Sequence, residues 1–279
     1  MPIQLEHHDS ALGRWQFARW CPPQLAGVVD SLWYFEGALA NTRERIFPDG
    51  RIELIVHLGP VYRQVDGTRV EPFTTCCISG LLLRSNLIEA PPEPCAVLGM
   101  RLHPAGAFAL LRQPLHELAG ITVDLNDLVG AASRELAECC ATAVTPQQRM
   151  YVAARWIASR MAHQSADPAV AWTARQIELH AGAISIAQLR QHVGWSKTRF
   201  TATFKHQIGV TPKILARIIR FRRVLEQVHR ADASLAQIAL NAGYFDQAHF
   251  NAEFRELSGF TPSAFLAARR YPGTVSIAE

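Results

Sequence analysis

The stretch from Trp195 to Pro212, WSKTRFTATFKHQIGVTP, occurs twice in the chain. Its second copy runs from Tyr244 to Pro262 and reads YFDQAHFNAEFRELSGFTP, with one extra residue near its start. Both copies keep two phenylalanines one helical turn apart, followed by the run Gly-x-Thr-Pro. Because an internal repeat sets the architecture of the segment that contains it, the C-terminal third should consist of two similar units.

Each copy, with the residues just before it, predicts a helix, a tight turn and a second helix. In the first unit Ser185 caps the first helix, Gly194 supplies the permissive backbone of the turn, Ser196 caps the second helix and Gly209 ends it. Two helices joined in this way form a helix–turn–helix, whose second helix can enter the major groove of DNA. The corresponding residues of the second unit are Ser234, Gly243, Asp246 and Gly259.

The aromatic positions of the repeat are predicted to be structural. In each second helix the two phenylalanines lie on one side, opposite the positions that would face DNA. The aromatic residue in each turn would fill the angle between the two helices. The predicted core residues of the two units are Trp195, Phe200, Phe204, Tyr244, Phe250 and Phe254.

Residues from about 170 to 270 resemble the DNA-binding domain of the AraC/XylS family of transcription regulators. The resemblance is specific, because its sharpest part covers about 25 positions in order within the second unit. The matching residues are Ile238-Ala239, Gly243-Tyr244, Asp246-Gln247, His249-Phe250, Phe254, Gly259 and Thr261-Pro262.

The resemblance implies which residues contact DNA, because in that family the exposed N-terminal half of each second helix faces the groove. Ala202 and Ala252 stand where the family often has arginine, so contact there should be weaker and more apolar. The implied partners are double-stranded DNA, a small-molecule effector and, if the protein is an activator, RNA polymerase. The residues predicted to contact DNA are Ser196, Lys197, Thr198, Arg199, Thr201, Ala202 and Lys205 in the first unit, and Asp246, Gln247, Ala248, Asn251 and Ala252 in the second.

The composition is that of a globular protein. With 279 residues, of which 49% are hydrophobic, the chain can bury a core and should form about two domains. No apolar run approaches the ~18–20 residues that cross a membrane. The N-terminus lacks a basic segment followed by an apolar core, which predicts a cytoplasmic protein without membrane contact. The adjacent pairs Cys76-Cys77 and Cys139-Cys140 are awkward for disulfides and favour reduced thiols.

The net charge of +4 is distributed unevenly along the chain. Residues 1–165 contain 14 arginines, no lysine and 16 acidic residues, for a net charge of −2. Residues 166–279 contain 14 basic and 8 acidic residues, for a net charge of +6. A basic region joined to a slightly acidic one is typical of a phosphate-binding module with a separate sensing module.

Residues 1–114 are predicted to form a β-rich, barrel-like sensing domain. Turns are expected at Pro48-Asp49-Gly50 and Asp66-Gly67. Phe47-Pro48-Asp49-Gly50 and the run LGMRLHPAG at 98–106 also resemble the N-terminal domain of one branch of the same family, which generally receives a signal. The expected strands are 31–36, 43–47, 51–58, 78–83 and 96–103.

Residues 115–165 are predicted to be a helical connector. One helix is expected from Asp124 to Cys140, another after the N-cap Thr145, and a linker over 162–167. The resemblance implies that such helices serve homodimerisation. Coverage of one side of the barrel is an equally weighted alternative.

Residues 166–279 are predicted to form an all-α domain, in which a long helix from Pro212 to about Val228 joins the two helix–turn–helix motifs. The predicted fold class is therefore α+β, with a barrel-like N-terminal domain, a helical connector and a helical DNA-binding domain. The arginines of the long helix are expected to contact phosphates or to pair with acidic neighbours such as Glu226.

The sequence contains no pattern typical of a catalytic site or a bound cofactor. A metal site could use Glu53, His57 and His103, but it would need three or four converging ligands, and the usual clustered His-x-His pattern is missing, so structural roles are favoured. Cys76 and Cys77 would point to opposite faces of a strand, which favours buried, inert thiols over a thiolate sensor. We therefore predict no metal, no cofactor and no enzymatic activity.

Three other classes of protein were weighed. A DNA-repair methyltransferase would need a Cys-rich module near the N-terminus, where only Cys21 lies in the first 75 residues. A barrel-fold small-molecule-binding protein or enzyme with a degenerate DNA-binding domain is the main alternative. The basic residues Lys197, Arg199 and Lys205 argue against that degeneration. A pure scaffold protein predicts no salt-dependent affinity for DNA.

Overall fold

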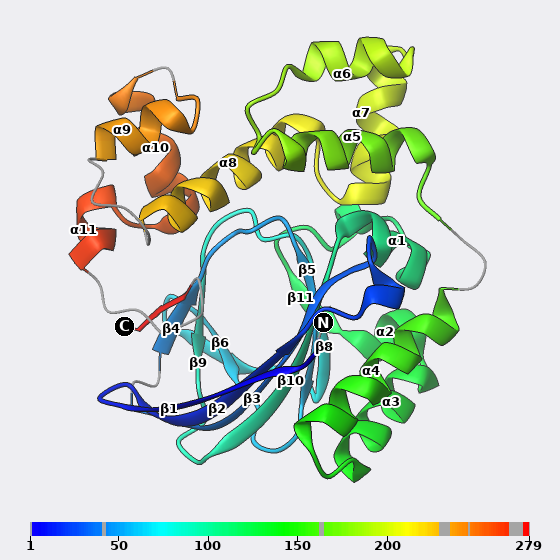
Figure 1. Cartoon of the computed structure of the whole chain (residues 1–279), viewed down its shortest axis with the longest axis vertical. Helices are drawn as coiled ribbons and strands as arrows, with labels where there is room; N and C mark the ends of the chain where they lie inside the picture. Colours follow the sequence, from blue (N-terminus) through cyan, green and yellow to red (C-terminus); the bar gives the residue numbers. More distant parts are fainter. Residues whose placement is uncertain are drawn as a thin grey trace.

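The computed structural model describes residues 2–40, 43–161, 165–228, 235–244, 246–267 and 276–278. A β-rich region occupies the N-terminal part and helices occupy the C-terminal part, which confirms the predicted α+β class (Figure 1). No helix among the described residues is both long enough and apolar enough to cross a membrane.

The N-terminal region is built from two antiparallel sheets that enclose a cavity. A seven-stranded sheet has the order β1-β2-β3-β10-β5-β8-β11, and a five-stranded sheet has the order β12-β4-β9-β6-β7. Over the described residues the strands thus form two sheets rather than one closed barrel, and we call this pair of sheets the barrel. The strands are β1 (Gln4–Ser10), β2 (Gly13–Trp20), β3 (Val29–Leu39), β4 (Arg43–Ile46), β5 (Ile52–His57), β6 (Arg63–Asp66), β7 (Arg69–Pro72), β8 (Cys76–Ser79), β9 (Asn86–Glu89), β10 (Cys95–Leu102), β11 (Thr122–Asp124) and β12 (Ser276–Ala278).

The five predicted strands all exist, but the boundaries of one were wrong and other strands were missed. β8 begins at Cys76 and ends before Gly80, where a side chain would overlap the carbonyl of Leu118. The hairpin at Asp66-Gly67 is confirmed, and Gly67 adopts a φ of 60° there. The hairpin of β1 and β2 was missed because β1 is almost entirely exposed and so has no apolar alternation.

The helical connector packs on the outside of the seven-stranded sheet. Its helix α3 contacts β5 and β8, and α4 contacts β3 and β10. The single helix predicted from Asp124 to Cys140 was wrong: Gly130, with a φ of 59°, divides it into two helices. These contacts fit the alternative in which the connector helices cover one side of the barrel. Dimerisation through these helices stays a prediction. The helices are α1 (Pro104–Leu111), the short 3-10 helix η2 (Leu115–Glu117), α2 (Leu125–Val129), α3 (Ala131–Thr142) and α4 (Pro146–Arg160).

The two repeats form two similar helical units at the ends of α8, which lies across one end of the barrel (Figure 1). Ser185, Ser196 and Asp246 each accept a hydrogen bond from a first-turn amide, as predicted for N-caps. Ser234 and Phe245 lie outside the described residues, as does part of the predicted linker. The helices are α5 (Pro168–Leu179), α6 (Ile186–Val193), α7 (Lys197–Ile208), α8 (Pro212–Val228), α9 (Leu235–Asn241), α10 (Gln247–Ser258) and α11 (Pro262–Ala267).

The hydrophobic core crosses the predicted domain boundaries. One continuous cluster joins the barrel, the connector helices and the first unit, where η2 and α1 contact α7. A second cluster forms the interior of the second unit and includes Phe47 of the N-terminal region. Leu179 lies outside both clusters and is 65% exposed, because it ends α5 at the surface. The division into 1–114, 115–165 and 166–279 stays a prediction.

Candidate nucleic-acid interface and barrel cavity

The predicted DNA-facing side of the first unit is open to solvent. Of its seven residues, Thr201 is half-buried and the others are exposed. The Ser196 hydroxyl accepts a hydrogen bond from the backbone N–H of Arg199 at 3.3 Å, which fixes the start of α7. The Arg199 guanidinium lies 4.3 Å from the centre of the Trp195 ring, so a cation–π contact holds it beside the surface.

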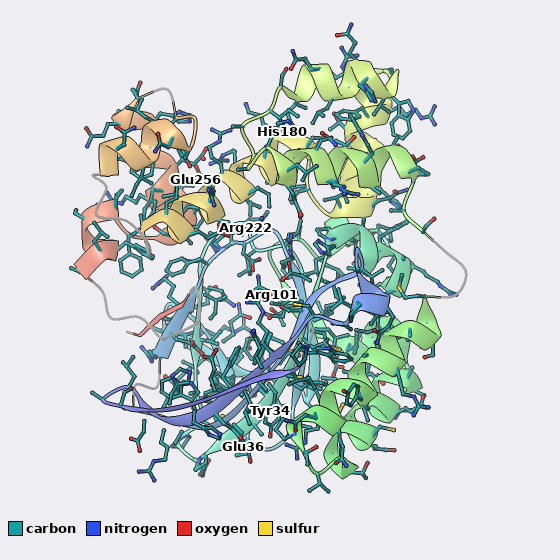
Figure 2. The ribbon with its side chains drawn as sticks, in the orientation of Figure 1. Tyr34, Glu36, Arg101, His180, Arg222 and Glu256 are labelled. Carbon is teal, nitrogen blue, oxygen red and sulfur yellow. The ribbon has the colours of Figure 1, made fainter. Side chains whose placement is uncertain are left out.

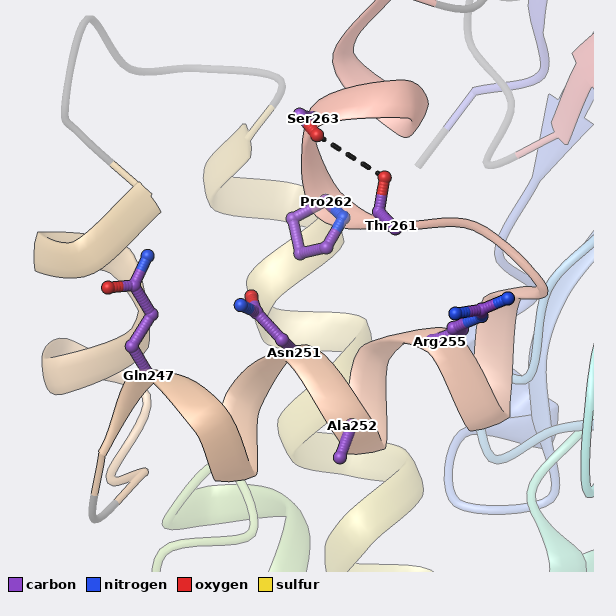
Figure 3. A pocket seen from close by; sticks show the side chains of 7 residues that line it. All are labelled: Gln247, Asn251, Ala252, Arg255, Thr261, Pro262 and Ser263. Carbon is purple, nitrogen blue, oxygen red and sulfur yellow. Dashed lines mark hydrogen bonds between the residues drawn. The ribbon is translucent and has the colours of Figure 1, made fainter.

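The predicted DNA-facing side of the second unit is also exposed at all five positions. It borders a groove of ≈ 470 Å³ between α10 and the start of α11 (Figure 3). The sequence analysis did not identify Arg255, Thr261 and Ser263 as surface candidates. The groove is lined by Gln247, Asn251, Ala252, Arg255, Thr261, Pro262 and Ser263.

The aromatic residues of the repeats lie on the opposite side of each second helix. Phe204 and Phe254 are fully buried, and Phe200, Tyr244 and Phe250 are at most 4% exposed. Trp195, also predicted for the core, is half-buried at its edge. The side chains predicted to be structural and those predicted to contact DNA therefore occupy different faces.

The arginines of α8 bind other protein groups. Arg217 donates to Glu253 at 2.8 Å and to Glu256 at 2.7 Å. Arg220 lies over the ring of Tyr244, with its carbon Cζ 5.3 Å from the ring centre. The hydroxyl of Tyr244 in turn donates to Glu253 at 2.8 Å, and burial together with that carboxylate raises the pKa of Tyr244. Pairing within the protein thus accounts for these arginines better than phosphate contact does.

The barrel encloses a cavity of ≈ 390 Å³, within the usual size range for small-molecule sites. Its walls have two parts. What we call the aromatic tier consists of Trp15, Phe17, Trp33, Phe35, Tyr62 and Phe73. What we call the charged tier lies at the end near α8 and consists of Arg19, Asp49, Arg51, Glu53 and Arg101.

Helix α8 contributes to the cavity wall above the charged tier. Arg222 and Glu226 line the cavity, and Figure 2 shows Arg222 between α8 and the barrel that contains Arg101. Arg222 donates to the backbone carbonyl of Asp49 at 3.0 Å. Burial and the nearby charge of Arg51 lower the pKa of Arg222. A molecule in the cavity would therefore contact α8 directly.

The charged tier is held together by hydrogen bonds and ion pairs. Asp49 accepts from Arg101 and, at 2.8 Å, from the backbone N–H of Arg51. Glu53 accepts from the indole N–H of Trp33 at 2.6 Å. Burial raises the pKa of Glu53, although Arg101 and the Trp33 N–H oppose that shift.

One ion pair of the tier reaches α5, the helix that precedes the first unit. Arg51 donates to Asp30 at 3.1 Å and to Glu178 of α5 at 2.6 Å. Burial alone would raise the pKa of Glu178, but contacts with His103 and Arg51 lower it to about 2. Glu178 is therefore ionised at neutral pH, and the pair ties α5 to the barrel.

The turn Phe47–Gly50 connects the barrel to the second unit and to α8. Phe47 is 2% exposed, and its ring centre lies 5.4 Å from that of Phe265. Gly50 has a φ of 78°, and a Cβ there would meet Ile219 of α8 at 2.6 Å. This turn, which resembles part of the N-terminal domain of one branch of the family, thus lies between the cavity and the C-terminal helices.

The residues of the alternative metal site have separate structural roles. His57 is buried and its Nδ1–H donates a hydrogen bond to the carbonyl of Thr74 at 3.1 Å, while His103 lies 3.8 Å from Glu178. Among the described residues no three His, Cys, Asp or Glu side chains are grouped as metal ligands would be. Burial raises the pKa of Cys76 to about 11 and of Cys77 to about 12, so both thiols stay protonated at neutral pH.

Comparison with known proteins matches both parts of the chain. A family described as a helix-turn-helix domain matches residues 189–268, and a domain of unknown function (DUF6597) matches residues 21–124. The chain is 30% identical over 117 residues to the probable transcription factor PqrA of Proteus vulgaris. This alignment covers 93% of PqrA and 41% of this chain. The chain belongs to the AraC/XylS family of transcription regulators.

Two further regulators each match about a third of this AraC/XylS-family chain. It is 29% identical over 82 residues to the probable transcriptional regulator LumQ of Photobacterium leiognathi. This alignment covers 29% of this chain and 33% of LumQ. It is also 29% identical over 94 residues to the probable thc operon regulatory protein of Rhodococcus erythropolis. That alignment covers 32% of this chain and 28% of the regulatory protein. The chain thus matches about a third or less of the length of these two relatives.

Among solved structures, ToxT of Vibrio cholerae aligns with this AraC/XylS-family chain at a TM-score of 0.47 and 11% identity. The alignment covers 81% of this chain and 96% of ToxT. The AraC-like activator CuxR aligns at a TM-score of 0.29 and 14% identity, over 80% of this chain and 86% of CuxR.

Proposed function

We propose that the protein is a sequence-specific DNA-binding transcription regulator that inserts α7 and α10 into successive major grooves. The observation that carries this proposal is the pair of exposed, capped helix faces at the two ends of α8. The 17 residues of α8 span about 25 Å at 1.5 Å per residue. With the helical units added at its ends, the distance between α7 and α10 approaches the ~34 Å between successive major grooves.

The second part of the proposal is that a small-molecule effector binds in the barrel cavity. What supports it is the shared wall, since Arg222 and Glu226 of α8 line the cavity. An occupant would alter the contacts of Asp49, Arg51 and Arg222 and so the position of α8. Contact with RNA polymerase and homodimerisation stay predictions of the family resemblance.

The test of the proposal is genome-wide mapping of the sites bound by the tagged full-length protein, followed by binding assays with purified DNA. We expect a few sites that share two half-sites about one helical turn apart. Binding that is independent of sequence and salt would favour the alternative, a ligand-binding protein with a degenerate DNA-binding domain.

We predict that Gln247→Ala and Asn251→Ala relax specificity at separate base pairs. Both side chains are exposed on α10 beside the groove, and such amides pair with adenine in the major groove. Each change should cost ~1–3 kcal/mol of discrimination. Competition binding with single-base variants of the bound site measures it. An equal loss of affinity on every sequence would instead assign these residues to phosphate contacts.

We predict that the first unit supplies more of the electrostatic affinity than the second. Lys197, Arg199 and Lys205 are exposed on α7. The second unit instead carries Asp246, Glu253, Arg255 and Glu256, and both glutamates pair with Arg217. Because each neutralised phosphate adds about 0.9 to the salt slope, the double change Lys197→Ala/Arg199→Ala should flatten that slope. Affinity measured over a series of salt concentrations gives the slope.

The matched comparison for the salt experiment is the double change Gln247→Ala/Asn251→Ala, which removes no charge. It should weaken binding while leaving the salt slope nearly unchanged. If it flattened the slope more than the change in α7 did, the assignment of roles to the two units would be wrong.

A further inference from the structure

We propose that the barrel cavity binds a planar aromatic molecule with an uncharged hydrogen-bonding substituent. Its ring would stack on the indole of Trp33, and its substituent would reach the charged tier beneath α8. The inference rests on the proposed effector role of the cavity and defines the chemical class of the effector.

The first step is that Trp33 forms a fixed flat surface inside the cavity. Trp33 on β3 pairs with Gly99 on β10. A Cβ at Gly99 would overlap three atoms of the indole, which therefore lies directly against the backbone of β10. The indole N–H donates to Glu53 on β5 at 2.6 Å. The ring thus extends from β3 across β10 to β5 and is held at both ends.

The second step is that the surroundings of Trp33 favour a flat ring. The ring of Phe17 is nearly parallel to that of Trp33, with an interplanar angle of 18° and a centroid distance of 6.3 Å. Phe35, Tyr62 and Phe73 line the same cavity. Stacked and edge-on aromatic contacts add to the free energy of burying apolar surface, so a planar aromatic guest gains more here than a saturated ring of equal size.

The third step concerns charge. The residues that line the cavity include four basic and four acidic side chains, so their formal charges balance. Ion pairs among or beside them join Arg101 to Asp49, Arg51 to Asp30, and Arg222 to Glu226. Because the lining charges already balance, a charged substituent would add an uncompensated buried charge, which is unfavourable there. An amide or hydroxyl can exchange hydrogen bonds with the tier without disturbing this balance. The lining charges are Arg19, Arg51, Arg101 and Arg222, and Glu44, Asp49, Glu53 and Glu226.

The test measures binding of four probes to the full-length protein by isothermal titration calorimetry and ligand-observed NMR. Indole-3-acetamide is the neutral aromatic probe, and 2-cyclohexylacetamide is its saturated counterpart. Indole-3-acetate and tryptamine carry a negative and a positive charge on the same ring. We expect indole-3-acetamide to bind at least about fivefold more tightly than each of the others, in line with the worth of one aromatic contact.

Two variants locate the bound ring. Trp33→Leu should reduce affinity for indole-3-acetamide at least about fivefold, and Gly99→Ala should do the same by displacing the indole. Trp172→Leu is the matched control, because Trp172 stacks on His192 in the helical region, away from the cavity. It should leave probe binding unchanged. Circular dichroism of each variant verifies that it is folded.

The outcomes separate this inference from the proposed function. Salt-dependent DNA binding by the unliganded protein is measured in parallel and tests the regulator itself. Two results would overturn the aromatic class while DNA binding holds. In one, 2-cyclohexylacetamide binds as tightly as indole-3-acetamide. In the other, the Trp33→Leu protein binds indole-3-acetamide as tightly as the native protein does. Tighter binding of indole-3-acetate or tryptamine would overturn the requirement for an uncharged substituent.

Discussion

Replacement of Phe254 by alanine should unfold the second helix–turn–helix unit and abolish DNA binding. Phe254 is fully buried, and its ring centre lies 5.3 Å from Phe221, 5.6 Å from Phe250 and 5.4 Å from Phe265. Truncating a buried phenylalanine costs about 3–5 kcal/mol. This is a large share of the ~5–15 kcal/mol that stabilises a domain.

Circular dichroism and thermal denaturation measure this effect, together with a DNA-binding assay. Lys197→Ala is the control, because its side chain is exposed and its loss should weaken binding without loss of helical signal. A Phe254→Ala protein with native helicity and native affinity would contradict the structural role of the aromatic pairs.

Replacement of Phe47 by alanine should release the second unit from the barrel, although residue 47 lies some two hundred positions before that unit in the sequence. Phe47 is almost fully buried among Phe221, Phe260 and Phe265, at ring distances of 6.4, 6.5 and 5.4 Å. We expect a loss of about 3–5 kcal/mol at this contact. Because ~1.4 kcal/mol corresponds to a factor of ten, hydrogen exchange in α10 and α11 should accelerate at least tenfold.

The control for this prediction is Phe73→Ala, which truncates the same residue type in the barrel wall, where it stacks on His57. It should leave hydrogen exchange in α10 and α11 unchanged.

A fragment of residues 168–272 tests the same contact by removing the whole barrel, and Phe47 with it. It should still bind DNA in a salt-dependent way, but with a less stable second unit, because it lacks Phe47. Equal exchange in native and Phe47→Ala proteins would show that this contact is not stabilising.

The repeat, its caps and the long helix could be predicted from the sequence because they depend on short-range interactions. A serine or aspartate at an N-cap acts on amides within one turn, and a glycine with positive φ ends a helix at its own position. Ser196, Gly209 and Asp246 therefore behave as predicted. The break at Gly130 was missed, because a glycine within an apolar helical pattern is often tolerated.

The barrel was predicted less completely than the helices. The hairpin of β1 and β2 has few buried residues, and hydrophobic periodicity detects only strands with a buried face. The exposed groove residues Arg255 and Thr261 were missed for a different reason. Their position beside Gln247 depends on how α11 packs against α10, which no local pattern encodes.

The sequence by itself determined the family, the two helix–turn–helix motifs and the separation of their buried and exposed faces. Only the tertiary structure decided that Phe47 completes the core of the second unit, that Arg51 pairs with Glu178, and that α8 walls the cavity. The physical reason is the distance along the sequence over which each interaction acts. Caps and periodicity act between neighbours in the chain, whereas burial and ion pairing join residues that only the complete fold brings together.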